Sequence, residues 1–510
     1  MRRLITFIIC LVAVLALFRL YTRFKVIAAP IPPGVYLGGL ELSDLKDPAE
    51  IRQHLEGVYN QTIEVDFGDT QLPLRPQEVD FQLDVATMVK EAKQYLDGPP
   101  FIDIAIRAAL GFPQQRRDIR VRFTLNQAKL RAWLENAALE HNSTPIGAHA
   151  LPPLAERTSI SATAISSATV TSDLANRAWR WAPGIPGYTL DVEKSMPPVV
   201  AALARDENRV AKLVLTEIPP SRPSMTDLTE VVSNTLGTFP GFAAVYVRDL
   251  QHGDEANVDG EVAFSGMATI KLALMAAAFA QLKVEDPAIA QAIGQMLAED
   301  DNATANQLLT LLGHGDQNAG AQSVTDFVRK LGLNNTYLQG GFNVPPLPPL
   351  STPANQRTDW NTKPDPNLQT TPVDLGRLLA AIYECTEGKG VLVASNPDRF
   401  ARTTCRQMLT YVAQDQLQAL LWLGLPNPKD RWVVHQQGIA DQTQGDVALI
   451  WGPTGPYVIA VFLYQGGWLD RQVSSATMQQ VSRLVWDFFD LQKNQGEVSA
   501  GAPPSLTPFR

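Results

Sequence analysis

Residues 264–281 read FSGMATIKLALMAAAFAQ, and the rest of this 510-residue chain is best understood around them. A Ser-Gly turn leads into a continuous apolar run, which predicts a buried helix with a candidate site at its first turn. Lys271 is the only charged residue of the run, and a lysine amine among apolar groups is unfavourable unless it is paired or used chemically. The simpler alternative is that Lys271 extends its ammonium group to solvent at the start of the helix.

Two later stretches, together with this helix, form a recognisable set of motifs. Residues 299–306 read EDDNATAN and residues 434–438 read VHQQG. Three short motifs result, Ala268-Thr269-Ile270-Lys271, Asp300-Asp301-Asn302 and Gln436-Gln437-Gly438. They resemble the Ser-x-x-Lys, Ser-Asp-Asn and Lys-Thr-Gly motifs of class A β-lactamases and related penicillin-binding serine hydrolases. The residues that match the family unchanged are Lys271, Asp301, Asn302 and Gly438.

The resemblance implies that the nucleophile is missing. Ala268 stands where the family has its serine, and a methyl group has no lone pair with which to attack a carbonyl. Thr269 is two positions from Lys271 and is expected to point away from it, while Ser265 precedes the helix. A substitute nucleophile, and hence an active hydrolase with non-standard residues, remains the alternative.

The resemblance also implies that the substrate carboxylate is no longer attracted. Asp300 replaces a serine and would repel that carboxylate, and Gln436 replaces the lysine that binds it. Gln437 is bulkier than the family's threonine. Residues 344–370 correspond to the loop that carries a deacylating glutamate in class A enzymes, and they contain no Glu. Only the frame remains, with the amides of residues 268 and 439 (Ile439) where the oxyanion hole would be.

Lys271 and Asp300 are expected to form an ion pair, because the family's geometry places these two positions close together. Asn302 is expected as a third partner. Pairing would spare both charges the cost of isolated burial, so a catalytic lysine would have become a structural one. The alternative is that Asp300 turns outward and caps the following helix.

The order of expected elements predicts an α+β multidomain protein. Residues 225–490 read as one strand, many helices, a hairpin and a closing helix, which resembles the β-lactamase and transpeptidase fold with its helical middle and antiparallel sheet. Residues 30–218 predict a small α+β region, whose PGIPGYTLD at residues 183–191 resembles a peptidoglycan-binding domain found ahead of envelope hydrolases. The Pro-rich residues 219–224 are the expected linker, and residues 491–510 an expected disordered tail.

The first 29 residues predict an export signal. Residues 4–27 are largely apolar with basic residues on both sides, which favours an uncleaved single-pass anchor in the cytoplasmic membrane with the bulk of the chain outside. A cleaved signal peptide is the alternative. In an oxidising compartment Cys385 and Cys405, which flank one short connection between two helical patterns, are expected to form a disulfide; two separate buried thiols are the alternative.

The formal net charge of -9 and the lack of a basic cluster argue against nucleic acid as a partner. No metal or cofactor is expected. We expect a catalytically inactive envelope protein that binds peptidoglycan, a muropeptide fragment or a protein partner. Two alternatives remain: an active hydrolase that acts on β-lactams or peptidoglycan peptides, and a purely structural spacer with a closed pocket.

Overall fold

The computed structural model describes residues 11–14, 16–18, 21, 34–42, 47–94, 106–107, 112, 116–153, 178–414 and 419–493. The chain divides into two compact units. The N-terminal unit takes its residues from 1–146 and 185–220, and the C-terminal unit from 147–184 and 221–510.

In its described residues, the N-terminal unit is built from small sheets and helices around a hydrophobic core. Its helices are α2 (Pro48–Tyr59), α3 (Val85–Gln94), α5 (Gln127–His141) and α7 (Val192–Leu203), with a 3-10 turn η2 (Pro76–Val79). Its strands are β1 (Val35–Leu37), β2 (Leu40–Glu41), β3 (Ile63–Phe67), β4 (Thr70–Leu74), β5 (Gln82–Leu83), β6 (Arg117–Ile119), β7 (Phe123–Thr124), β10 (Gly187–Leu190), β11 (Val210–Lys212) and β12 (Leu215–Ile218). They pair as β2-β1-β6, β11-β3-β4, β5-β7 and β10-β12.

A long-range pairing closes this unit. Strand β11 lies parallel to β3, with Ala211 opposite Val65, so two segments far apart in the sequence share one sheet. Strand β3 alternates buried and more exposed residues, as a strand with one face on a core should. The expected α+β character of the region is therefore present in the described residues.

The C-terminal unit is organised around a five-stranded antiparallel sheet in the order β14-β13-β20-β19-β18. Its strands are β13 (Phe242–Asp249), β14 (Glu255–Val258), β18 (Val433–Ile439), β19 (Thr443–Gly452) and β20 (Gly455–Tyr464). Strands β19 and β20 are buried along nearly their whole length, which shows that both faces of the sheet are covered.

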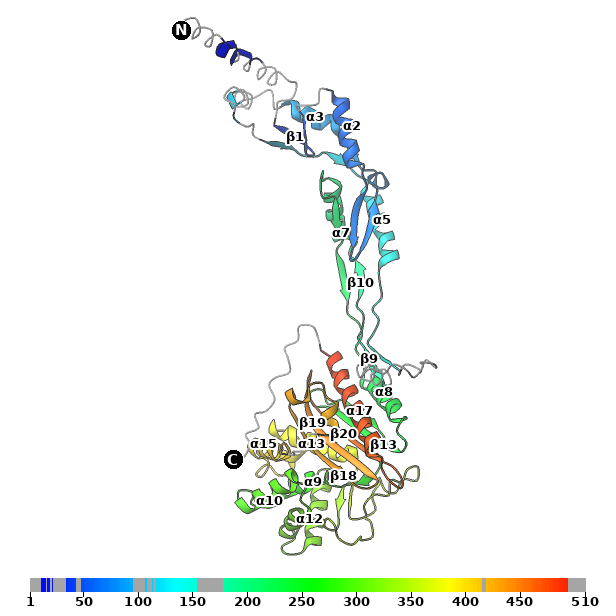
Figure 1. Cartoon of the computed structure of the whole chain (residues 1–510), viewed down its shortest axis with the longest axis vertical. Helices are drawn as coiled ribbons and strands as arrows, with labels where there is room; N and C mark the ends of the chain where they lie inside the picture. The colour runs from blue at the N-terminus through cyan, green and yellow to red at the C-terminus, as the bar shows by residue number, and fades with distance from the viewer. Residues whose placement is uncertain are drawn as a thin grey trace. The chain divides into compact units, whose positions relative to one another are not determined.

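Helices cover the two faces of this sheet (Figure 1). On one face lie α8 (Met225–Leu236), α16 (Leu421–Gly424) and α17 (Arg471–Leu491), with the short η3 (Pro428–Asp430) nearby. The other face carries the larger helical layer: α9 (Lys271–Gln281), α10 (Pro287–Ala298), α11 (Asn302–Leu312), α12 (Gln317–Lys330), α13 (Pro372–Thr386), α14 (Val391–Ser395) and α15 (Arg402–Val412). A small sheet, β15 (Phe264–Ser265), β17 (Leu368–Thr370) and β16 (Tyr337–Leu338), completes the unit.

Helix α9 is the centre of the helical layer. Every residue from Lys271 to Phe279 is buried, and α9 contacts α10, α11, α12, α13 and α15. A helix that is apolar all round is stable only inside a core, so the composition of residues 264–281 fixes this position.

Short polar caps set where the surrounding helices begin. Ser224 and Asp227 form a capping box at α8, and Thr371 caps α13 with Pro372 in its first turn. Asp301, Asp316 and Asp470 cap α11, α12 and α17 in the same way. The boundaries of the long helices were therefore readable from the sequence.

The units divide differently from the expected domains in one place. We assigned residues 147–184 to the N-terminal region, but their described parts belong to the C-terminal unit. Strands β8 (His149–Leu151) and β9 (Arg180–Ala182) form a hairpin that contacts α8 and α17. The indole of Trp181 donates to the Leu484 carbonyl at 3.0 Å, a long-range contact that carries no local sequence signal.

Three expectations fall largely outside the described residues. They concern most of the apolar segment 4–27, the polar stretch around residues 158–172 and the tail after residue 493. Within the part of the chain that the structure describes, no helix has both the length and the apolar character needed to cross a bilayer.

Candidate functional site

The candidate site lies at the turn that leads into α9. Met267 has a left-handed backbone conformation, with φ of 47°, which is uncommon for a residue with a side chain and marks a tightly specified turn. Ala268 follows and is 7% exposed. Its N–H has no hydrogen-bond acceptor among the described residues. The turn thus presents a free amide and, as the side chain of Ala268, only a methyl group.

Neither neighbouring hydroxyl replaces the missing nucleophile in this geometry. The Thr269 hydroxyl is buried and donates to the Gly266 carbonyl at 2.6 Å. The Ser265 hydroxyl accepts the N–H of Asp365 at 2.9 Å. Both hydroxyls are hydrogen-bonded to backbone groups, and neither residue lies on α9 beside Lys271.

Lys271 is fully buried and its ammonium group donates to the carboxylate of Asp300. The ring of Phe342 lies 5.3 Å from the Lys271 nitrogen, a favourable position for a cation. Burial lowers the pKa of Lys271, and the Asp300 carboxylate opposes that shift. The lysine is therefore held by an acidic partner and an aromatic ring.

The two adjacent aspartates have different roles. Asp300 adopts a left-handed conformation, with φ of 53°, which aspartate tolerates better than most residues. Asp301 is the cap of α11 and accepts the Ala303 N–H at 2.8 Å. Asn302 is the first residue of α11, and no hydrogen bond joins it to Lys271 among the described contacts. The pair of Lys271 and Asp300 forms as expected, whereas the third partner is Phe342 and not Asn302.

Strand β18 places the third motif at the edge of the sheet. Gln436 is 1% exposed, and its side-chain oxygen has no hydrogen-bond partner in the described structure. Alternation along the strand puts Gln436 on the same face as Gly438, and Gln437 on the opposite face with His435. Of the two glutamines, only Gln436 therefore shares a face with the α9 turn.

Gly438 lets this strand approach the turn closely. A Cβ at this position would lie 2.7 Å from the Cβ of Met267 and 2.9 Å from the nitrogen of Ala268, so only glycine fits. Ladder hydrogen bonds to β19 are made at alternate positions, including Ala440 to Thr443 at 2.8 Å. Ile439 lies between these positions, so its N–H points away from β19. The edge strand and the α9 turn are thus in close contact at Gly438.

The loop over residues 344–367 is held by amide side chains. Asn306 on α11 bonds to both backbone groups of Phe342, at 3.0 and 2.7 Å. Further along, Asn355 bonds to the Leu350 carbonyl and to Gln369. The sequence did not predict that Asn306 would hold the backbone of Phe342. The two residues are 36 positions apart in the chain, and no local pattern signals their contact.

A second buried polar pair, also missed, lies on the opposite face of β18. The imidazole of His435 is 3.1 Å from the carboxylate of Asp446, and both side chains are buried. The same carboxylate accepts the Leu421 N–H at 3.2 Å, which ties α16 to the sheet. This pair supports the packing of α16 and does not reach the α9 turn.

Cys385 near the end of α13 and Cys405 in α15 form a disulfide, with Cα atoms 5.7 Å apart. Both residues are buried in the core of the helical layer. Among the residues that the structure describes, no group of three or more His, Cys, Asp or Glu side chains is arranged to hold a metal ion.

Comparison with known proteins agrees with this geometry. Residues 284–489 match the model of the β-lactamase enzyme family. The C-terminal unit is therefore a β-lactamase-like domain, with helices packed on an antiparallel sheet. The match begins after α9, so it does not include the Ala268–Lys271 turn.

Several solved structures of β-lactamases are similar to part of this chain. An ancestral class A β-lactamase shares 22% identity, with 51% of this chain and 98% of that chain covered and a TM-score of 0.39. The enzyme of the last common ancestor of Gram-negative bacteria shares 23% identity over 51% and 99% of the two chains, with a TM-score of 0.40. A β-lactamase from Streptosporangium roseum shares 17% identity over 51% and 99%, with a TM-score of 0.40. No curated protein matches the chain.

Proposed function

We propose that the β-lactamase-like domain does not acylate, and that the whole chain is an envelope protein that binds peptidoglycan or a muropeptide fragment without cutting it. One observation carries the first part of this proposal. The nucleophile position is Ala268, and the lysine that would activate a nucleophile there is buried and engaged by Asp300. A covalent route needs both an attacking atom and a base to take its proton.

The charges around the turn disfavour the usual substrates of such a site. Asp300 puts a carboxylate where a substrate carboxylate would approach, and like charges repel. Gln436 has no charge with which to attract that carboxylate. The free amides of Ala268 and Ile439 remain able to bind a neutral carbonyl oxygen.

The binding part of the proposal draws on the rest of the chain. The sequence of residues 30–218 resembles that of a peptidoglycan-binding domain. The apolar segment 4–27 is suited to export and to attachment to the cytoplasmic membrane. An active hydrolase with a substitute nucleophile finds no support, because the Thr269 and Ser265 hydroxyls are used by the backbone.

Two measurements on the purified full chain test the proposal. Incubation with a fluorescent penicillin, followed by intact-mass spectrometry, should give no covalent adduct, with an active class A β-lactamase as positive control. Co-sedimentation with insoluble peptidoglycan should then show binding without release of soluble fragments. A stoichiometric adduct would overturn the first part, and its site would identify the nucleophile. Failure to sediment would overturn the second part and favour a structural spacer.

A further inference from the structure

A cavity of about 330 Å³ lies beside α13, away from the α9 turn. Its lining includes five aliphatic residues, Leu331, Leu333, Leu378, Ala381 and Val391. It also includes three charged residues, Arg248, Arg377 and Glu384. A pocket of this size with apolar walls and a few polar groups has the general character of a small-ligand site.

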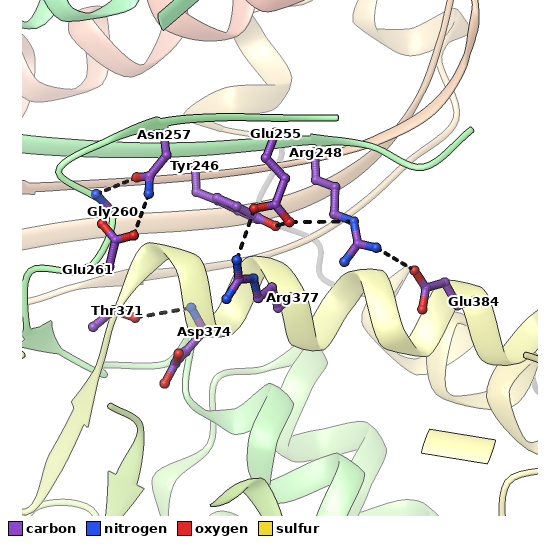
Figure 2. Close-up of polar contacts among 10 residues, drawn as sticks. All are labelled: Tyr246, Arg248, Glu255, Asn257, Gly260, Glu261, Thr371, Asp374, Arg377 and Glu384. Carbon is purple, nitrogen blue, oxygen red and sulfur yellow. Dashed lines mark hydrogen bonds and ion pairs between the residues drawn. The ribbon is translucent and has the colours of Figure 1, made fainter. Parts of the chain in front are cut away.

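The charged groups come from the sheet and from the helix that packs on it. Figure 2 shows Arg377 and Glu384 extending from α13 toward Glu255 and Arg248 on the sheet. Arg377 donates to Glu255 at 3.1 Å, and the Tyr246 hydroxyl donates to the same carboxylate at 2.6 Å. Arg248 donates to Glu384 at 3.0 Å. The rotamers of both arginines are therefore fixed before any ligand arrives.

One hydrogen-bond donor at this cavity is not used. The Nε of Arg248 is buried and has no hydrogen-bond partner among the described residues. The nearest oxygen of Glu255 is 3.9 Å away, which is too far for a hydrogen bond. Because this nitrogen is closed to solvent and directed toward Glu255, a ligand in the cavity would meet the terminal nitrogens of Arg248.

The balance of charge selects the kind of ligand. Two arginines face two glutamates in the network, so its formal charge is zero. An added anion or cation would leave one uncompensated charge in a partly buried site, which is unfavourable. A zwitterion adds none: a carboxylate matches the guanidinium groups, and an ammonium group matches Glu384.

We propose that this cavity binds a small aliphatic zwitterion, an amino acid of the leucine type, with its carboxylate at Arg248 and Arg377 and its ammonium group at Glu384. The aliphatic side chain lies against Leu331, Leu378 and Val391. This site is separate from the degenerate one, and it does not depend on whether the domain acylates.

A purely structural network makes a different prediction. If the ion pairs serve only to fasten α13 to the sheet, the cavity has no preference among small solutes. The zwitterion site requires three groups at once, the carboxylate, the ammonium and the aliphatic side chain. Each can be removed separately from the probe.

The test is isothermal titration calorimetry of the full chain with DL-leucine. We expect saturable binding of leucine. N-acetyl-leucine, leucinamide and glycine should each bind at least about tenfold more weakly, since loss of one group costs about 1.4 kcal/mol or more. Val391 is 39% exposed at the rim, so Val391→Trp should fill the cavity, leave the ion pairs intact and abolish binding. Val473→Trp is the matched control, because Val473 is 36% exposed in the first turn of α17 and should bind like the parent.

Three results would overturn the proposal. They are the absence of saturable leucine binding at millimolar concentration, equal binding of leucine and its blocked analogues, and unchanged binding in a folded Val391→Trp variant. Equal melting temperatures of the two tryptophan variants would show that loss of binding is not loss of fold.

Discussion

The ammonium group of Lys271, which is fully buried, donates to the carboxylate of Asp300, whose side chain is 51% exposed. The pair thus joins the centre of the core to the surface at the start of α11. It converts the one charge on α9 into a structural contact, and it occupies the group that would have to act as a base. The consequences can be measured by restoring the chemistry and by breaking the pair.

The first prediction concerns restoration. Ala268→Ser alone should give little or no acylation by a penicillin, because Lys271 stays paired with Asp300 and Gln436 still fails to attract a carboxylate. Adding Asp300→Ser and Gln436→Lys frees the lysine and supplies positive charge, so the triple variant should acylate slowly. Intact-mass spectrometry over time measures the adduct, with the Ala268→Ser/Asp300→Ser double variant as control. A folded triple variant that stays unmodified would mean that the site is remodelled beyond these positions.

The second prediction concerns the pair itself. Asp300→Ala should lower the free energy of unfolding by about 1–3 kcal/mol, less than for a fully buried pair because solvent screens half of the carboxylate. Asp300→Asn should cost less, since asparagine tolerates the left-handed conformation and can accept a hydrogen bond. In a Lys271→Met background the Asp300→Ala change should cost little. Denaturant unfolding of the parent, Asp300→Ala, Lys271→Met and the double variant gives the coupling free energy between the two side chains. Equal costs of Asp300→Ala in both backgrounds would disprove the pairing.

Local chemistry made much of the fold readable in advance. The all-apolar run of α9, the cap and proline at the start of α13 and the strand pair β19–β20 follow from period, capping and turn residues within the segment itself. Helix α5, which we did not predict, carries the same kind of signal, because Leu130, Leu134 and Ala137 are buried at helical spacing.

The rest depended on contacts between distant segments. The motif triplets predicted that Asp300 would pair with Lys271, but not that the neighbouring Asp301 would cap α11. The aromatic partner of Lys271 comes from residue 342, and the hairpin of residues 149–182 finds its place only against α8 and α17. No local pattern encodes such partners, because their energy comes from packing across the chain.

The third prediction uses Asp374, which is buried in the first turn of α13. Its carboxylate accepts from Asn335 and Thr336 at 2.9 Å, but desolvation by burial raises its pKa from 3.8 to about 6. The folded state therefore holds the proton more tightly than the unfolded chain, so the stability from this group is present below pH 3.8 and is lost as pH rises through about 6.

Asp374→Asn should accordingly stabilise the protein by about 1–3 kcal/mol at pH 8, and by about a third of that amount at pH 4.5. Urea unfolding of parent and variant at the two pH values measures the difference. Asp326→Asn, at an exposed site on α12, is the control. A difference between parent and Asp374→Asn that is the same at both pH values would contradict the assigned cost of burial.

The fourth prediction concerns the bond between Cys385 and Cys405, which are 20 residues apart in the sequence. Closing a loop of this length restricts the unfolded chain, and its loss should cost about 3 kcal/mol. A reducing agent should therefore lower the melting temperature of the parent. The Cys385→Ala/Cys405→Ala variant should melt at a lower temperature and be insensitive to the reductant. Free-thiol counting that finds both cysteines reactive in the folded, unreduced protein would rule the bond out.

The last prediction tests whether the oxyanion frame is still held together by Gly438. A Cβ there would lie 2.7 Å from the Cβ of Met267 and 2.9 Å from the Ala268 nitrogen, and the backbone of the turn cannot move away because Met267 is already in a left-handed conformation. Gly438→Ala should therefore destabilise the domain by about 1–3 kcal/mol, as overpacking does.

Gly294→Ala is the matched control for Gly438→Ala, because it makes the same chemical change with the opposite expected sign. Gly294 lies inside α10, where a Cβ would meet its nearest atom at an ordinary 3.6 Å, so alanine should stabilise the helix by about 0.5–1 kcal/mol. Denaturant unfolding of both variants decides the matter. If Gly438→Ala is as stable as the parent, the edge strand and the α9 turn are not in fixed contact, and the triple variant of the first prediction should then fail to acylate for lack of an ordered oxyanion site.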